Sequence, residues 1–104
     1  MADTHRVLLT AGARADLEAI AGHIRRDSPQ NAAGVAERVI DAIDSLASMP
    51  TRFRRAGTSR NRGTPVHSMV VRPYIVYYRV EQGTASVHVL HVRHGKRRQP
   101  RRFE

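Results

Sequence analysis

The chain has 104 residues, of which 40% are hydrophobic, enough for one domain with a modest core. It has no cysteine, which excludes disulfides and thiolate metal sites. No apolar run approaches the roughly 20 residues that a membrane span needs, and residues 1–6 lack the apolar core of a signal peptide. We therefore expect a cytoplasmic protein.

The formal net charge is +9, and it is unevenly distributed. Residues 1–50 carry five cationic and seven acidic side chains, whereas residues 51–104 carry thirteen cationic and two acidic ones. Such asymmetry suggests an anionic partner, either nucleic acid or an acidic protein segment. Arginine supplies 17 of the 18 cations, and its planar guanidinium matches carboxylate and phosphate groups.

The chain begins with a strand and a helix. The apolar run Val7–Leu9 predicts a strand at about residues 5–10, after which Thr10 can cap a helix. Apolar side chains then recur at helical spacing, at Ala13, Leu17, Ile20, Ala21 and Ile24.

A second helix follows after a short break. Ser28 suits its N-cap, Pro29 suits its first position, and Pro50 stops it. Its apolar stripe consists of Ala32, Ala36, Val39, Ile40, Ile43, Leu46 and Ala47. Because so short a turn joins the two helices, we expect an antiparallel helical hairpin.

Residues 51–65 contain five arginines, two glycines and almost nothing to bury. This composition predicts a loop, with Phe53 as its tether. The arginine cluster is either a solvated surface or part of a contact.

Three strands are predicted after this loop, at residues 66–71, 74–80 and 84–92. Arg72-Pro73 forces a bend between the first two, and Gln82-Gly83 indicates a tight hairpin turn between the last two.

The pattern of the last strand shifts near Val89-Leu90, which indicates either burial on both faces or a β-bulge. In the strand before it, Tyr74 and Tyr78 share one face with Val76 and Val80, and we expect both tyrosines in the core. Ile75, Tyr77 and Arg79 fall on the other face, and Tyr77 is expected to be exposed.

The resulting order is β-α-α-β-β-β, an α+β fold in which a helical hairpin covers one face of a small, mostly antiparallel sheet. The opposite face is expected to be open. A single domain spans residues 1–95, with the Arg-rich loop 51–65 inside it, and residues 96–104 form a basic tail.

Four segments in this order resemble the RelE/ParE superfamily of toxins from type II toxin–antitoxin systems. The resemblance covers nearly the whole chain except the Arg-rich loop and the tail. The segments are Ala13–Ile20 (A-x-x-D-L-x-x-I), Ser28-Pro29 with Ala32-Ala33, Leu46 and Pro50, then Tyr74–Val80 (Y-x-[IV]-x-Y-R-V) and Val89–Arg97 (V-L-x-V-x-H-G-x-R).

The resemblance implies a growth-arresting toxin, bound by an antitoxin whose disordered C-terminal segment folds on it. RelE-like members cut mRNA on the ribosome, and ParE-like members act on DNA gyrase. The long hairpin and the H-G-x-R ending resemble the ParE-like branch more closely. We therefore expect a plasmid-stabilisation toxin that inhibits DNA gyrase by binding and forms a hetero-oligomer with a ParD-like antitoxin carrying an acidic C-terminal segment. The alternatives are a ribosome-dependent mRNA endonuclease and a non-toxic binding module of the same fold.

Whether the protein is an enzyme is open. A metal-independent endoribonuclease must activate a 2′-OH, stabilise a phosphorane and protonate a leaving oxygen, and the candidates are Arg72, Arg79, Arg93 and His94. RelE-like nucleases commonly place a Tyr near the C-terminus, whereas here no Tyr follows Tyr78. Binding is therefore favoured over catalysis.

A binding surface needs only shape and charge, and the cationic end of the last strand supplies both. The residues expected to bind target or antitoxin are Tyr77, Arg79, Arg93, His94, Lys96, Arg97 and Arg98. Direct nucleic-acid binding is not favoured, because the cations do not lie on a recognition helix.

No cofactor or metal is expected. His88, His91 and His94 are spaced by three, so on a regular strand they alternate between faces and do not converge.

Overall fold

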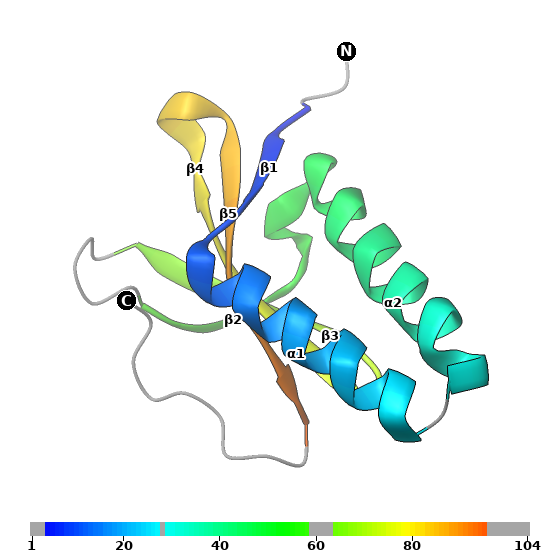
Figure 1. Ribbon diagram of the computed structural model, residues 1–104. Coiled ribbons are helices and arrows are strands. Elements are labelled where there is room, and N and C mark those ends of the chain that lie inside the picture. The colour runs from blue at the N-terminus through cyan, green and yellow to red at the C-terminus, as the bar shows by residue number, and fades with distance from the viewer. Residues whose placement is uncertain (1–3, 28, 59–63, 96–104) are drawn as a thin grey trace.

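The computed structural model describes residues 4–27, 29–58 and 64–95. It shows two helices covering one face of a five-stranded sheet (Figure 1). The elements are β1 (Arg6–Leu9), α1 (Ala11–Asp27), α2 (Pro29–Asp44), β2 (Arg54–Thr58), β3 (Pro65–Val71), β4 (Tyr74–Glu81) and β5 (Ser86–His94). The strand order is β1-β5-β4-β3-β2; β1 pairs parallel with β5, and every other pair is antiparallel. The predicted α+β fold is confirmed.

The helical hairpin forms largely as predicted. The Ala13 N–H donates to Thr10 Oγ1 at 3.2 Å, so Thr10 caps α1. The predicted cap Ser28 lies outside the described residues. The second helix is shorter than expected, because α2 ends at Asp44 and a 3₁₀ turn, Ser45–Ala47, takes over. Within the described residues, neither helix is long and apolar enough to cross a membrane.

The prediction that residues 51–65 form a loop is wrong in part. Arg54–Thr58 form β2, which pairs antiparallel with β3 along one edge of the sheet. An edge strand needs only one neighbour, and its exposed arginines discourage further pairing, so it lacks the apolar alternation that marks a central strand. Phe53 packs against the core from the start of this strand, as expected for a tether.

The main core lies between the helices and the sheet. Tyr78 is fully buried there, and its hydroxyl donates to the carbonyl oxygen of Pro50. The predicted core position of both Tyr74 and Tyr78 is confirmed. The other buried residues of this core are Ala13, Val39, Ile43, Leu46, Met69, Val76, Val80, Val87, Val89 and Val92.

The face of the sheet away from the helices has a second, smaller apolar cluster. It consists of Val66, Tyr77 and Leu90, with Ile75 packed against it. The prediction that Tyr77 is exposed is therefore wrong: only 6% of it is accessible. It lies on the predicted face, but neighbouring apolar side chains on that face cover it.

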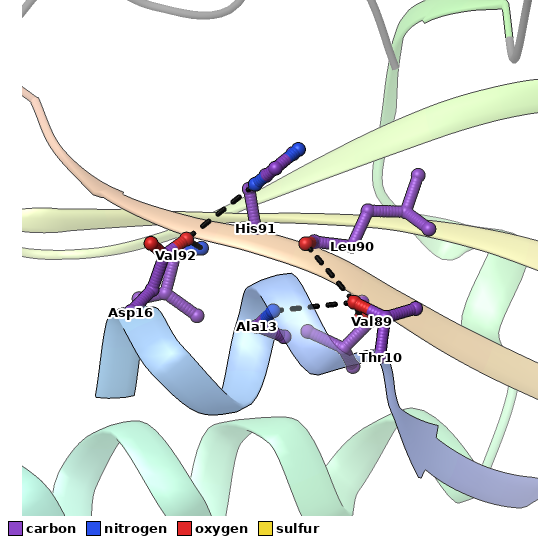
Figure 2. A network of polar contacts seen from close by, with 7 residues as sticks. All are labelled: Thr10, Ala13, Asp16, Val89, Leu90, His91 and Val92. Carbon is purple, nitrogen blue, oxygen red and sulfur yellow. Dashed lines mark hydrogen bonds and ion pairs between the residues drawn. The ribbon is translucent and has the colours of Figure 1, made fainter. Parts of the chain in front are cut away.

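A bulge in β5 changes which residues share a face. Tyr77 pairs with His91 and Tyr78 pairs with Val89, so Leu90 has no partner on β4. The bulge predicted near Val89-Leu90 is thus present. Leu90 joins the apolar cluster on the sheet face away from the helices, whereas the ring of His91 comes within 3.5 Å of Asp16 on α1 (Figure 2).

The bulge also corrects the expectation that the three histidines alternate. His88 pairs with Arg79, and His91 pairs with Tyr77, two residues away on β4, so these histidines lie on the same face. His94 pairs with Tyr74 and lies on the helix-covered face.

The turn between β4 and β5 is longer than the predicted tight hairpin. A 3₁₀ turn spans Gln82–Thr84, and Ala85 adopts a left-handed conformation with φ 48° before β5 begins at Ser86.

Candidate functional site

A polar network joins the start of α1 to the second half of β5 (Figure 2). Thr10 Oγ1 lies 2.8 Å from the carbonyl oxygen of Val89 and 3.2 Å from that of Leu90. Six residues later, Asp16 Oδ2 accepts the N–H of Val92 at 3.0 Å. Because β1 ends at Leu9, opposite Val89, no strand of the described residues pairs with the rest of β5 on that side. Asp16 thus supplies the acceptor that a neighbouring strand would have given.

His91 completes this network. Its Nδ1 lies 3.5 Å from Asp16 Oδ2, and both side chains are about one-quarter exposed, at 23% and 22%. The same carboxylate therefore satisfies a backbone N–H and faces an imidazole. These contacts fix the end of β5 against α1.

A groove of about 330 Å³ opens between α1 and the end of β5. Two arginines and two histidines line it, His23 and Arg26 from α1 and Arg93 and His94 from β5. Its remaining lining residues are Asp16, Ala19, Ile20, Tyr74 and Val92. We call this the α1–β5 groove. A hollow that combines four cationic or protonatable side chains with an apolar floor suits an acidic ligand.

The far end of the α1–β5 groove is held in place by β4. The rings of His94 and Tyr74 meet edge to face, with centroids 5.5 Å apart and planes at 83°. The Gly95 N–H donates to the carbonyl oxygen of Pro73 at 2.8 Å. A Cβ on Gly95 would lie 3.3 Å from that same oxygen, so glycine permits this close approach.

The structure brings together three of the four residues predicted for RNA cleavage. Arg93 and His94 lie in the α1–β5 groove, and Arg72 is exposed on the adjacent β3–β4 turn, where its carbonyl oxygen accepts from Arg38. Arg79 lies five residues beyond Tyr74 on β4, or about 16 Å at ~3.3 Å per residue. It is only 4% exposed and lies 3.4 Å from Glu81, so it belongs to a different part of the sheet.

Tyr74 is the tyrosine that lines the α1–β5 groove, and the other two tyrosines of β4, Tyr77 and Tyr78, have raised pKa values. Burial raises the pKa of Tyr77 above its ordinary value of 10.0, although the nearby Arg93 charge lowers it in part. Burial raises the pKa of Tyr78 to about 12, against an opposing effect of Arg52. Both phenols therefore stay protonated near neutral pH.

The other predicted binding residues, Lys96, Arg97 and Arg98, lie outside the described residues.

Sequence reasoning missed the contribution of α1 to this site. His23 and Arg26 stand on one stripe with Asp16, Ala19 and Ile20, and this i, i+3, i+4, i+7 spacing was the available signal. The Asp16 bond to the Val92 N–H and the core packing of Leu17, Ile20 and Ile24 hold this stripe beside β5. Across residues 4–27, 29–58 and 64–95, no three His, Asp or Glu side chains are grouped so as to hold a metal ion.

A second groove, of about 560 Å³, lies on the sheet face away from the helices. Its apolar residues include Val70, which is 63% exposed. We call it the open-face groove. Its lining residues are Phe53, Arg54, Arg55, Ala56, Ser68, Val70, Ile75 and Tyr77.

Comparisons with known proteins agree on the kind of molecule. Residues 7–99 match a family model described as the ParE toxin of the type II toxin–antitoxin system parDE. Toxin RelE2 of Caulobacter vibrioides is 39% identical over 92 residues, which cover 88% of this chain and 97% of that protein. Two solved structures share the fold. A chain of the chromosomal ParDE system of P. aeruginosa has a TM-score of 0.68 at 20% identity, covering 88% of this chain and 97% of that one. A chain of the RelBE2 toxin–antitoxin complex of Mycobacterium tuberculosis has a TM-score of 0.58 at 25% identity, covering 88% and 91%.

Proposed function

Because this chain belongs to the ParE toxin family of type II toxin–antitoxin systems, we propose that it inhibits DNA gyrase by binding it. A ParD-like antitoxin neutralises the toxin by forming a complex with it. Such a toxin acts in the cytoplasm, where gyrase works on DNA. The observation that carries the proposal is the α1–β5 groove, whose arginines and histidines offer charge and shape to an acidic protein surface.

The arrangement of the candidate catalytic residues supports binding over catalysis. RNA cleavage needs a base, an acid and a phosphate-stabilising cation around one phosphate. Arg79 lies far from Arg93 and His94 and is paired with Glu81, while Tyr77 and Tyr78 are buried in their protonated forms. These residues do not surround a single phosphate.

A supercoiling assay with purified gyrase tests the proposal. We expect wild-type protein to inhibit supercoiling, and Arg93→Gln with His94→Gln to need about ten-fold more protein for the same effect, because lost charge pairs weaken docking. Arg14→Gln is the matched control, since Arg14 is an exposed cation of α1 outside the groove. Absence of inhibition by a large excess of folded wild-type protein would contradict the proposal.

A second candidate function, ribosome-dependent mRNA cleavage, is favoured by one observation. His91 and Arg93 lie on the same face of β5, and the Asp16 carboxylate stands 3.5 Å from His91 Nδ1, as if to orient the ring. Primer extension on translated mRNA after induction tests this alternative. Codon-linked cuts that disappear in His91→Gln would favour it, and their absence in wild type would exclude it.

A further inference from the structure

We propose that this chain associates head to tail with further copies of itself, so that the outer face of α2 in one copy lies in the open-face groove of the next. This self-association is separate from the proposed binding of gyrase and does not depend on it. Two exposed surfaces of the described residues carry the inference, because they match each other in polarity, charge and size.

The outer face of α2 combines an aliphatic side chain with acidic ones. Glu37, Ile40, Asp41 and Asp44 follow one another at the i, i+3, i+4, i+7 spacing, so they form a single stripe along the helix. All four are exposed, and Ile40 is 50% exposed whereas its neighbour Val39 is buried. We call these four residues the α2 stripe.

The one cation of α2 does not neutralise this stripe. Arg38 is the single basic residue in the helix sequence Pro29–Asp44. Its guanidinium donates to the carbonyl oxygen of Arg72 at 2.9 Å, which holds it toward the turn between β3 and β4. The α2 stripe therefore presents three carboxylates around an aliphatic side chain.

The open-face groove has the complementary character. Val70, which is 63% exposed, pairs with Ile75 on β4, and together they provide an apolar strip. Arg54 and Arg55 line the groove on the β2 side, and no acidic side chain of the described residues lines it. Arg93 pairs with Ile75 from the β5 side, so cations flank the strip on both sides. An exposed apolar surface rimmed by charge is typical of a protein contact.

The two surfaces also agree in length. Glu37 and Asp44 are seven residues apart on α2, or about 10 Å at ~1.5 Å per residue. Arg54 and Arg93 are three strand spacings apart, or about 14 Å at ~4.8 Å per strand. When α2 is laid across the strands with Ile40 on the apolar strip, the carboxylates at the two ends of the stripe reach the arginines at the two sides of the groove.

The α2 stripe and the open-face groove lie on opposite sides of the molecule, because the helices cover one face of the sheet and the groove opens on the other (Figure 1). A heterologous contact of this kind adds one copy after another and does not close as a two-fold dimer. The net charge of +9 on each copy opposes association at low ionic strength. A Debye length of about 8 Å at 0.15 M screens this repulsion, while charge pairs in contact lie inside that length.

Sedimentation velocity of the full chain at 0.15 M NaCl, after nuclease treatment, tests the head-to-tail contact. We expect the mean mass of the wild type to rise beyond that of two copies between about 10 and 500 μM protein. Ile40→Asp places a charge in the centre of the stripe, and Val70→Asp places one in the groove. Each should need about ten-fold more protein for the same mean mass. Ala15→Asp is the matched control, since it adds the same charge at an exposed position of α1 outside both surfaces.

An equal mixture of Ile40→Asp and Val70→Asp identifies the geometry of the contact. The first variant keeps an intact groove and the second keeps an intact stripe, so together they make one wild-type contact. We expect the mixture to form dimers at concentrations where each variant alone is monomeric, and to grow no further. This rescue also shows that both variants are folded.

Four results would overturn the proposal. They are a wild type that stays monomeric over the whole range, a mixture without rescue, a loss in Ala15→Asp as large as that in Ile40→Asp, and assembly that is seen only before nuclease treatment. A mixture without rescue would indicate a symmetric dimer, and the last result would assign the assembly to bound nucleic acid. None of these measurements involves gyrase, so self-association and gyrase inhibition are tested separately.

Discussion

Asp16 makes two contacts through a single carboxylate. It accepts the Val92 N–H at 3.0 Å and faces His91 at 3.5 Å, on the side of β5 away from β4, where no strand of the described residues pairs with it. The motif residue that helped to suggest the family thus has a structural task, which is to close an open sheet edge and hold α1 beside the candidate site.

Replacing Asp16 by alanine should therefore destabilise the fold. We expect Asp16→Ala to lower the free energy of unfolding by about 1–3 kcal/mol, because it leaves a partly buried backbone N–H without an acceptor. Asp16→Asn should cost less, since its amide oxygen can still accept. Urea unfolding measures both, with Glu18→Ala as an exposed control on the same helix. A cost for Glu18→Ala as large as for Asp16→Ala would contradict this role.

The raised pKa of Tyr78 predicts that the free energy of unfolding decreases at alkaline pH. Burial raises its pKa to about 12 in the folded state, against about 10 when unfolded. Between these values the folded state binds more protons than the unfolded state, so the free energy of unfolding falls as pH rises from 10 to 12. Below pH 10 this contribution is fully present.

Urea unfolding between pH 8 and pH 11 measures the effect. Tyr78→Phe has no phenol at this position, so its stability should decline less steeply above pH 10 than that of wild type. Parallel declines in the two proteins would show that Tyr78 is not the titrating group.

Thr10 connects the start of α1 to β5. Its hydroxyl caps α1 by accepting the Ala13 N–H and also contacts the carbonyl oxygens of Val89 and Leu90 at the bulge. Thr10→Ala should cost about 1–2 kcal/mol of stability, as other N-cap losses do. Thr10→Ser keeps the hydroxyl and should restore most of that stability. Thermal and urea unfolding would measure the difference, and no rescue by serine would mean that the hydroxyl is not what matters.

The helices and central strands were predictable from sequence, whereas the edge strand Arg54–Thr58 and the effect of the bulge on the histidines were not. Apolar periodicity identifies the helical hairpin and the strand Tyr74–Glu81, because each buries one or both faces. Arg54–Thr58 buries little and is held by pairing to one neighbour. Its residues therefore lack the apolar pattern from which a strand is predicted. The local pattern signalled the bulge at Leu90, but its effect on His88 and His91 depends on the register with β4.

In the candidate site, too, residues adjacent in sequence were predictable and residues brought together by the fold were not. The cationic end of the last strand was visible at Arg93 and His94, since both are neighbours in sequence. The partners His23 and Arg26 come from a helix about 70 residues earlier. Core packing and the Asp16 bond to the Val92 N–H place that helix beside β5. Single-sequence patterns carry no record of such a contact.

At the scale of the whole molecule, the acidic and the cationic side chains are concentrated in different parts of the chain. The helices carry most of the acidic residues, whereas the chain after residue 50 carries thirteen of the eighteen cations. Both grooves take cations from this second half: Arg93 lines the α1–β5 groove, and Arg54 and Arg55 line the open-face groove. The field of the molecule therefore favours acidic partners at both of its candidate surfaces.

This charge distribution predicts that association with gyrase depends strongly on salt. Attraction between the cationic surface of this chain and an acidic surface of the partner raises association rates at low ionic strength. Screening over a Debye length of about 10 Å at 0.1 M reduces this attraction. We expect the association rate with immobilised gyrase to fall about ten-fold or more between 0.05 and 0.5 M NaCl, while the dissociation rate changes far less. Arg93→Gln should flatten this dependence and Arg14→Gln should not, because only Arg93 lies in the groove. A salt dependence carried mainly by the dissociation rate would place the charges in short-range contacts and argue against steering.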